Sequence, residues 1–118
     1  MSSSQVHASI PAMVRTAAAT HGAHVAIEDG ATQIAYADLP SLVHSAARGL
    51  WAHGIQHGDR VAIWAPNCWE WIIAALAIHT VGGVLVPINT RYKGAEARFI
   101  IDRASCKAIF TVDGFLGL

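Results

Sequence analysis

Short apolar runs alternate along this chain with longer segments in which apolar residues recur every three or four positions. The runs at residues 61–64 and 84–88 are apolar on both faces, which predicts strands of a covered parallel sheet. The segment between them is apolar and ends at Gly82-Gly83, a pair that is typical of a helix end. Strand, crossover helix and strand in this order predict a βαβ unit, and the run at residues 107–112 predicts a third strand.

Helical spacing also marks residues 12–20, residues 95–104 and the segment that follows Asp38. The apolar faces of these three predicted helices consist, in the same order, of Met13, Val14 and Ala17; of Ala97, Ile100, Ile101 and Ala104; and of Leu39, Leu42, Val43, Ala46, Ala47 and Leu50.

Turn and capping residues separate these elements. Asp29-Gly30 lies between two strand-like runs, which predicts a β-hairpin with this pair at its turn. Asp38 is expected to cap the helix that follows it. Asn67, with Glu70 three positions on, is expected to cap the helix behind the first parallel strand.

Together these elements predict an α/β fold, namely the N-terminal part of a doubly wound, mainly parallel sheet with flanking helices and a preceding β-hairpin. Residues 1–9 are polar and predict a disordered N-terminus. Residues 10–118 are then expected to form a partial N-terminal domain, since three strands leave an open sheet edge and a partly uncovered face.

The composition limits the possible partners. The 118-residue chain has a formal net charge of +0, which argues against nucleic acid as a partner and against a polybasic membrane patch. Charged residues make up only 14% of the chain and the mean hydropathy is +0.39, which is more apolar than a small soluble domain needs. Either a membrane or a missing partner surface would account for this excess.

Residues 72–88 form the apolar stretch that bears on the membrane alternative. The stretch falls short of the roughly 20 residues that span a bilayer, and Gly82-Gly83 and Pro87 interrupt it. The N-terminus has neither the basic region nor the apolar core of a signal peptide. We therefore expect no transmembrane helix and a cytoplasmic location.

Few side chains suggest chemistry. The chain has no Gly-rich phosphate loop with a following Lys, no Rossmann fingerprint and no nucleophile elbow, so no catalytic residue is predicted. The pairs His21/His24 and His53/His57 have ligand-like spacing but no accompanying Cys or acidic cluster. This pattern favours a surface role for the four histidines, and no metal site is predicted.

Several other side chains are expected to pack rather than to bind. Cys68 and Cys106 lack a metal-type pairing and are expected to be free buried thiols. His79 lies among apolar residues, which favours a buried histidine with a hydrogen-bond partner over a functional one. Trp69 and Trp71 are two positions apart on a helix, so they are expected to point apart and to pack in the core or in an interface.

The loop after the second parallel strand holds the candidate ligand-binding residues. Open α/β sheets bind ligands at the carboxyl ends of their strands, and Arg91 lies at such an end. Its guanidinium suits a phosphate group, so Arg91 is the strongest candidate, with Asn89 and Thr90 as weaker ones. The alternative is an arginine that is merely solvated.

Three motifs, in order, resemble those of the AMP-forming acyl-CoA synthetases, which belong to the adenylate-forming superfamily. They are IAYADL at residues 34–39, similar to the family's (T/S)YxEL motif; GDRVAI at residues 58–63, similar to its GDRVAI strand; and GGVLVPIN at residues 82–89, similar to its AGxxxxPxN motif. Residues 63–71, 77–79 and 89–92 are most similar to actinobacterial ligases for fatty acids or for the propionate side chain of steroid-ring remnants.

The resemblance implies an acid–thiol ligase that works in two steps. A carboxylic acid attacks the α-phosphate of ATP to give an acyl-adenylate and pyrophosphate, and the thiol of CoA then displaces AMP. The resemblance thus implies ATP, Mg²⁺ and CoA as cofactors of the full-length enzyme, in fatty acid metabolism or steroid catabolism. It also implies that Arg91 lies near the nucleotide part of CoA, where its cation would pair with a phosphate.

The departures from the family concern the catalytic machinery. The family's phosphate loop with its Lys, its Thr-Glu motif, its ribose-binding Asp and its C-terminal-domain Lys are missing from this sequence. We therefore expect a truncated ligase that binds no cofactor by itself, is inactive alone, and has the missing C-terminal remainder as its partner. Lys93 stands where relatives tend to have a capping Thr, so the helix after it is expected to begin less firmly.

Two alternatives belong to other function classes. The chain could be a non-catalytic interaction module that pairs through its open sheet edge with another protein or with a separately encoded remainder. It could also be a small membrane-associated protein, which partition into the soluble fraction would disfavour.

Overall fold

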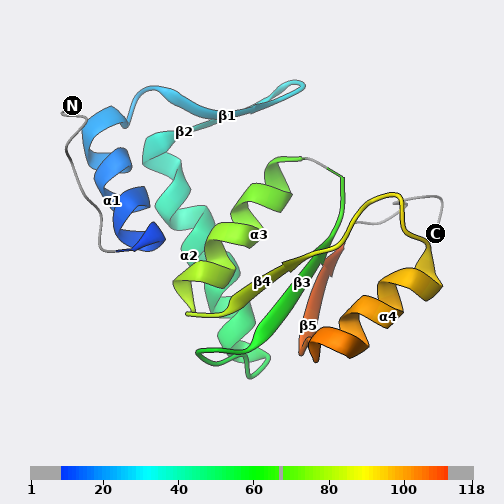
Figure 1. Ribbon diagram of the computed structural model, residues 1–118. Coiled ribbons are helices and arrows are strands. Elements are labelled where there is room, and N and C mark those ends of the chain that lie inside the picture. The colour runs from blue at the N-terminus through cyan, green and yellow to red at the C-terminus, as the bar shows by residue number, and fades with distance from the viewer. Residues whose placement is uncertain (1–8, 67, 112–118) are drawn as a thin grey trace.

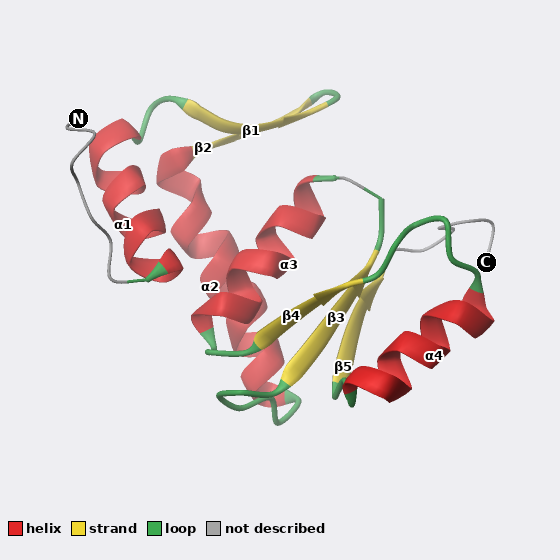
Figure 2. Cartoon of the chain, in the orientation of Figure 1, coloured by secondary structure: helices red, strands yellow, loops and turns green. Residues whose placement is uncertain are grey.

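The computed structural model describes residues 9–66 and 68–111, and it places helices on both faces of a parallel sheet (Figure 1). From β3 onward strands and helices alternate, as the βαβ pattern predicts (Figure 2). The elements are α1 (Ile10–His21), β1 (Val25–Asp29), β2 (Thr32–Ala35), the 3₁₀ turn η1 (Tyr36–Asp38), α2 (Leu39–Ala52), β3 (Arg60–Trp64), α3 (Trp69–Thr80), β4 (Val84–Pro87), α4 (Gly94–Ala104) and β5 (Ala108–Thr111).

The central strand of the parallel sheet is β3, which lies between β4 and β5. Ala62 of β3 is in register with Val86 of β4 on one side and with Ile109 of β5 on the other. α3 connects β3 to β4, and α4 leads from β4 back across β3 to β5, so the two crossovers run in opposite directions. Right-handed crossovers of opposite direction place their helices on opposite faces, which is the doubly wound arrangement. The predicted α/β fold class is therefore confirmed.

Alternate residues of β3 point into two separate cores. Val61 and Ile63 are 0% and 1% exposed and lie in the main core, together with residues of α2 and α3. Ala62, between them, packs on the opposite face with Ile88 and with Ala97 of α4. The predicted apolar side of α2 is confirmed by the burial of Leu39, Val43, Ala47 and Leu50.

The hairpin forms as predicted, but its turn lies one residue further along. Asp29 pairs with Thr32, so the two-residue turn is Gly30-Ala31. Gly30 has a φ of +58°, which suits a hairpin loop with glycine at its first central position. Asp29 is consequently a strand residue, and its side chain reaches another element.

Local capping differs from the predictions at the first two helices. α1 begins at Ile10, two residues earlier than predicted, because the Ser9 side chain accepts a hydrogen bond from the Ala12 N–H at 3.2 Å. Asp38 precedes α2 as predicted, but its backbone is already helical and its side chain makes no capping hydrogen bond. The expectation that Asp38 caps α2 through its side chain is therefore wrong.

α3 also begins differently from the prediction. The expected cap, Asn67, lies outside the described residues. The helix begins at Trp69, with Cys68 in the N-cap position and without a side-chain cap from that residue. Glu70 is then the second helical residue, one short of the place that a capping-box acid occupies.

The carboxyl end of α3 agrees with its glycine pair. The Gly82 N–H donates to the His79 carbonyl at 3.1 Å, and the Gly83 N–H donates to the Ile78 carbonyl at 2.9 Å, which together form a Schellman motif. Gly82 has a φ of +75°, and a Cβ at this position would lie 2.5 Å from Cδ2 of His57. Both the backbone conformation and the neighbouring imidazole therefore require glycine.

Several apolar residues are less buried than their pattern predicts. β4 is an edge strand within the described chain and Val84 is 46% exposed, so the prediction of cover on both faces holds for β3 and is wrong for β4. Of the predicted apolar face of α1, Val14 is buried as expected, but Met13 is 42% exposed. His79 is only half-buried, so its expected burial is wrong as well.

Within residues 9–66 and 68–111, no helix is long and apolar enough to cross a bilayer.

Candidate functional site

The connections that follow β3 and β4 begin at neighbouring carboxyl ends of the sheet and run to opposite faces of it. The chain leaves β3 toward α3, which covers one face, and leaves β4 toward α4, which covers the other. Figure 1 shows the two connections diverging from neighbouring strand ends. In open α/β sheets, the crevice between two such connections is where ligands bind.

The connection after β4 carries the three predicted binding residues on a tight turn. The Arg91 N–H donates to Oδ1 of Asn89 at 2.8 Å, and the Tyr92 N–H donates to the Asn89 carbonyl at 3.0 Å. The Ile88 N–H donates to the Ile63 carbonyl at 2.9 Å, which attaches the turn to the sheet. Asn89 therefore shapes the turn, Thr90 is half-buried beside it, and Arg91 extends into solvent.

Arg91 is available to an anion. Its side chain is exposed, and among the residues that the structure describes the two ion pairs are Arg98–Asp102 and Lys107–Asp59, neither of which involves it. A guanidinium without a carboxylate partner retains its full set of five donors for a ligand. The assignments of Arg91, Asn89 and Thr90 as binding residues stay predictions.

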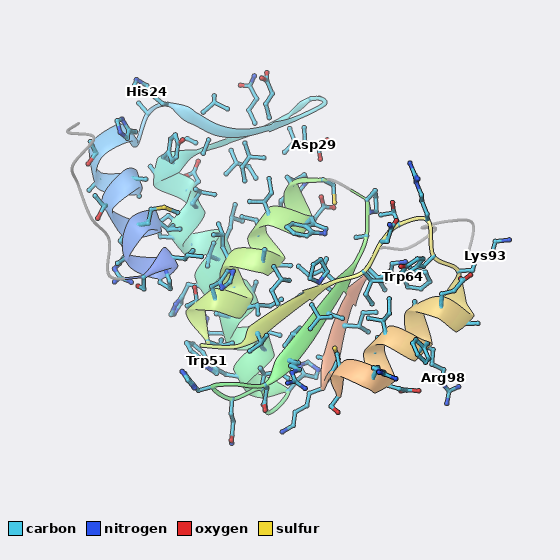
Figure 3. The ribbon with its side chains drawn as sticks, in the orientation of Figure 1. His24, Asp29, Trp51, Trp64, Lys93 and Arg98 are labelled. Carbon is cyan, nitrogen blue, oxygen red and sulfur yellow. The ribbon has the colours of Figure 1, made fainter. Side chains whose placement is uncertain are left out.

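Lys93 adds a second cation to this turn, and sequence reasoning missed it as a candidate. Its backbone N–H donates to the Glu96 carboxylate, which forms one half of a capping box at the start of α4. The other half of a capping box is a hydrogen bond that the N-cap side chain accepts from the helix backbone, and the Lys93 ammonium has donors only, so it cannot accept one. The Lys93 side chain remains exposed at the helix start (Figure 3). The signal in the sequence that could have identified Lys93 as a candidate is its position two residues after Arg91. A hollow of about 600 Å³ adjoins it, lined by Tyr92, Lys93, Ala95, Glu96, Phe99 and Ile100.

The connection after β3 is held by a side chain from the hairpin. Oδ2 of Asp29 accepts a hydrogen bond from the Trp69 N–H at 3.0 Å, across 40 positions in the sequence. Cys68 provides no side-chain cap, so Asp29 takes the place of a local N-cap residue. Its carboxylate also lies at the positive end of the α3 dipole. The contact joins distant elements, and sequence reasoning therefore missed it.

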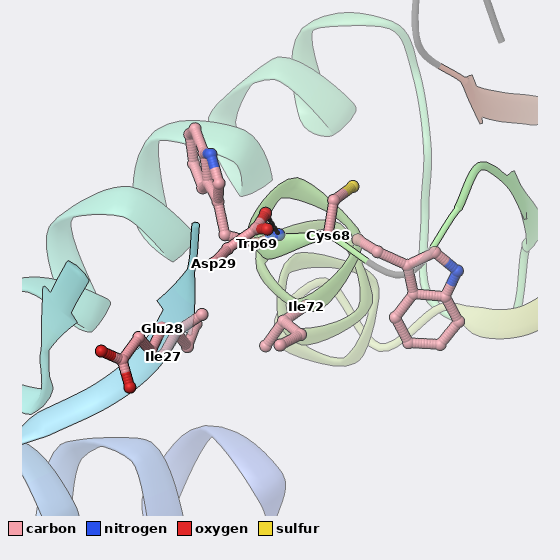
Figure 4. A pocket seen from close by; sticks show the side chains of 7 residues that line it. Ile27, Glu28, Asp29, Cys68, Trp69 and Ile72 are labelled. Atoms are coloured by element: carbon pink, nitrogen blue, oxygen red, sulfur yellow. Dashed lines mark hydrogen bonds between the residues drawn. The ribbon is translucent and has the colours of Figure 1, made fainter. Parts of the chain in front are cut away.

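A cavity of about 370 Å³ lies beside this contact, between β1 and the start of α3 (Figure 4). Trp69 and Trp71 are half-buried and pack against the main core, which confirms the packing role predicted for them. The residues that line the cavity are Ile27, Glu28, Asp29, Cys68, Trp69, Trp71 and Ile72.

Asp29→Ala is expected to lower the free energy of unfolding by about 1 kcal/mol, because α3 loses the side-chain cap that Asp29 provides at Trp69. Asp29→Asn retains an acceptor oxygen and is expected to retain most of the stability. Urea denaturation followed by far-UV circular dichroism measures both variants. Asp38→Ala is the control, since Asp38 makes no capping bond, and it is expected to change stability by less than about 0.5 kcal/mol. Equal losses in Asp29→Ala and Asp38→Ala would contradict the role of Asp29.

The histidines and cysteines form no cluster that could hold a metal ion within the described part of the chain. The rings of His21 and His24 stack with their centroids 6.0 Å apart, and His53 hydrogen-bonds to the Gly49 carbonyl at 2.8 Å. Cys68 and Cys106 are free, as predicted, but only half-buried. Burial raises the pKa of the Cys106 thiol, and the nearby Arg60 cation opposes that rise.

Comparison with known proteins relates this fold to one enzyme family. Residues 14–117 match the AMP-binding enzyme family. The chain is 49% identical over 80 residues to a methyl-dioxo-octahydroindenyl-propanoyl:CoA ligase of Mycobacterium tuberculosis, an alignment that covers 68% of this chain and 16% of the relative. It is 38% identical over 107 residues to the Rhodococcus jostii ligase of the same name, covering 91% of this chain and 21% of that relative.

Solved structures agree with this relationship. A fatty acyl-CoA synthetase of Mycobacterium tuberculosis superposes with a TM-score of 0.82 at 31% identity, over 87% of this chain and 21% of that chain. A mutant form of coronafacic acid ligase from Pectobacterium brasiliense superposes with a TM-score of 0.86 at 26% identity, over 92% of this chain and 22% of that chain. This chain thus spans 16% and 21% of the length of the two curated relatives. Since the family match extends over residues 14–117, the chain belongs to the AMP-binding enzymes, and its relatives are acyl-CoA ligases.

Proposed function

We propose that this chain forms the N-terminal part of an ATP-dependent, AMP-forming acyl-CoA ligase. The whole enzyme converts a carboxylic acid, ATP and CoA into acyl-CoA, AMP and pyrophosphate, and it works in the cytoplasm. The observation that carries this proposal is the 38% identity to a propanoyl:CoA ligase over 91% of the chain. Bound Mg²⁺ would neutralise charge on the phosphates of ATP, and this chain's own contribution is a binding surface for CoA.

The turn at residues 89–93 is the part of this chain that meets CoA. Arg91 pairs with a phosphate of the nucleotide portion, because its guanidinium is exposed and has no carboxylate partner among the described residues. Asn89 supports this role by holding the Arg91 N–H, and Lys93 supplies a second positive charge nearby. Thr90 is a weaker contact on the same turn.

The acid is a propionate side chain on a steroid-ring remnant, and the enzyme belongs to steroid catabolism. The names of two relatives, at 49% and 38% identity, support this substrate class. A fatty acid is the second candidate substrate, which the likeness to a fatty acyl-CoA synthetase supports.

The purified 118-residue chain is expected to form neither AMP nor acyl-CoA from ATP, CoA and either class of acid. The reason is that the family's phosphate loop and catalytic lysine are missing from this sequence. Chromatographic separation of the nucleotides and thioesters measures the reaction. Turnover above a control without protein would contradict the expected inactivity.

A chimera tests the ligase assignment itself. In this chimera, the present chain replaces the matching segment of the Rhodococcus jostii ligase, to which it is 38% identical. The chimera is expected to convert the relative's acid into its CoA thioester, because the rest of the relative supplies the catalytic groups. A folded chimera without activity would sink the proposed function.

A further inference from the structure

Trp64 is the last residue of β3, at the carboxyl end of the sheet, and its side chain lies on the face that α4 covers. Side chains alternate along a strand, so Trp64 shares this face with Ala62, while Ile63 between them packs in the main core. Ile88, which follows β4, is 4% exposed and belongs to the same second core as Ala62. The parallel register of β3 and β4 places Trp64 beside Ile88 at this end of the sheet.

The turn at residues 89–93 has little direct attachment to the sheet. Among the described residues, the hydrogen bonds of this turn link its own residues or reach α4. The bond that attaches the connection to β3 runs from the Ile88 N–H to the Ile63 carbonyl, one residue before the turn. The position of the turn relative to the sheet therefore depends on how the side chains beside it pack.

Trp64 is the largest side chain that packs against the second core, whose buried members are Ala62, Ile88 and Ala97. Ile88 comes one residue before the turn, and Ala97 lies in the first turns of α4 after it. The second core therefore holds both ends of the turn. Figure 3 shows the Trp64 side chain in the angle between the connection that follows β4 and α4.

We propose that Trp64 is a positioning residue of the ligase, whose indole fixes the 89–93 turn against the sheet and so directs Arg91 toward a phosphate of CoA. This inference rests on the proposed function, since that function gives Arg91 its ligand. The Arg91 side chain is exposed and takes part in neither of the two ion pairs of the described chain, so the position of the turn sets where its guanidinium lies. A small displacement weakens a hydrogen bond to phosphate, because the bond depends on distance and angle.

Amide hydrogen exchange in the 118-residue chain tests whether Trp64 holds the turn. The Arg91 and Tyr92 amides both donate to Asn89 and so report on the turn. In Trp64→Ala these two amides are expected to exchange at least about fivefold faster, because the space beside the turn is emptied. Trp64→Phe keeps an aromatic ring there and is expected to keep both rates within about twofold. Trp64→Val, which favours a strand, replaces the alanine variant if that variant does not fold.

Ile101→Ala is the matched control for a loss of packing. Ile101 also packs against the second core, but near the carboxyl end of α4, away from the turn. Its truncation is expected to lower the urea midpoint as Trp64→Ala does, and to leave the exchange of the Arg91 and Tyr92 amides within about twofold, because these amides exchange through local opening. Equal acceleration in Ile101→Ala, or unchanged exchange in Trp64→Ala, would overturn the inference.

Kinetics in the chimera test whether Trp64 acts through Arg91. Trp64→Ala is expected to raise the KM for CoA by about fivefold, less than the loss of Arg91 itself, because the guanidinium is still present. The kcat and the KM for ATP are expected to stay within about twofold. In the double variant with Arg91→Ala, the KM for CoA is expected to lie within about twofold of that of Arg91→Ala alone, because no guanidinium is left to position.

Two kinetic results would contradict the inference. One is an unchanged KM for CoA in Trp64→Ala, and the other is a double variant in which the two effects multiply, since Trp64 would then act independently of Arg91. A parent chimera without activity would instead count against the proposed function alone, because amide exchange measures the effect of Trp64 on the turn without turnover.

Discussion

Ile78→Ala is expected to lower the free energy of unfolding by about 2–5 kcal/mol, the range for removing a buried isoleucine side chain from a packed core. Ile78 is 0% exposed and lies in the main core near the carboxyl end of α3. Its Cγ2 lies 3.2 Å from the position that a Cβ at Gly83 would take, so the side chain also packs under the turn that ends the helix. Alanine would leave a cavity that neither the sheet nor α2 can fill without moving.

Ile72→Ala provides the matched control on the same helix. Ile72 is 40% exposed, so the same truncation removes less buried surface, and we expect a loss of less than about 1 kcal/mol. The shift in urea midpoint, followed by far-UV circular dichroism, compares the two variants. Similar shifts would show that α3 is not anchored through Ile78.

Arg91→Ala in the chimera is expected to raise the KM for CoA by about tenfold. A hydrogen bond to a charged group is typically worth about 1.5–3 kcal/mol, and about 1.4 kcal/mol corresponds to a factor of ten. The KM values for ATP and for the acid, together with kcat, are expected to stay within about twofold, because in its proposed role Arg91 contacts the nucleotide part of CoA rather than the reacting atoms. Steady-state kinetics with each substrate varied in turn separates these effects.

Arg98→Ala is the control for Arg91. Arg98 is also an exposed arginine, but it lies on α4 and pairs with Asp102 at 3.7 Å, where both side chains are largely in solvent. Its removal deletes the same charge from a neighbouring surface and is expected to leave the KM for CoA unchanged. An equal rise in the KM for CoA in both variants would mean that Arg91 acts only through the overall charge of this surface. An unchanged KM for CoA in both variants would show that Arg91 does not bind CoA.

The regular elements could be predicted from the sequence because their signals are local. The apolar run at Val61 to Trp64 is too short for a helix, which favours a covered strand, and β3 forms there. The spacing of Leu39, Val43, Ala47 and Leu50 places them on one side of a helix, and all four are buried. The Gly82-Gly83 pair ends α3 through backbone conformation and hydrogen bonds that involve only nearby residues.

Features that depend on distant partners could not be predicted in this way. Asp29 was predicted as a turn residue, yet it caps a helix that begins 40 positions later. Val84 and Met13 follow apolar patterns but are exposed, because burial depends on which neighbour covers a face. The sequence places Lys93 two residues after Arg91, but its exposed position at the start of α4 depends on the fold.

Local sequence patterns are thus enough to predict which segments become strands and helices, that the strands are parallel, and that the loop after β4 carries an arginine. Hydrophobic periodicity and turn residues are properties of short stretches of chain, so they favour a strand, a helix or a turn whatever distant segments do. The packing of distant segments sets two further features, namely that the hairpin holds the start of α3 and that β3 lies between β4 and β5 in the sheet. Capping across elements, position within a sheet and burial all depend on which segments meet, and segments far apart in the sequence come together only in the folded chain.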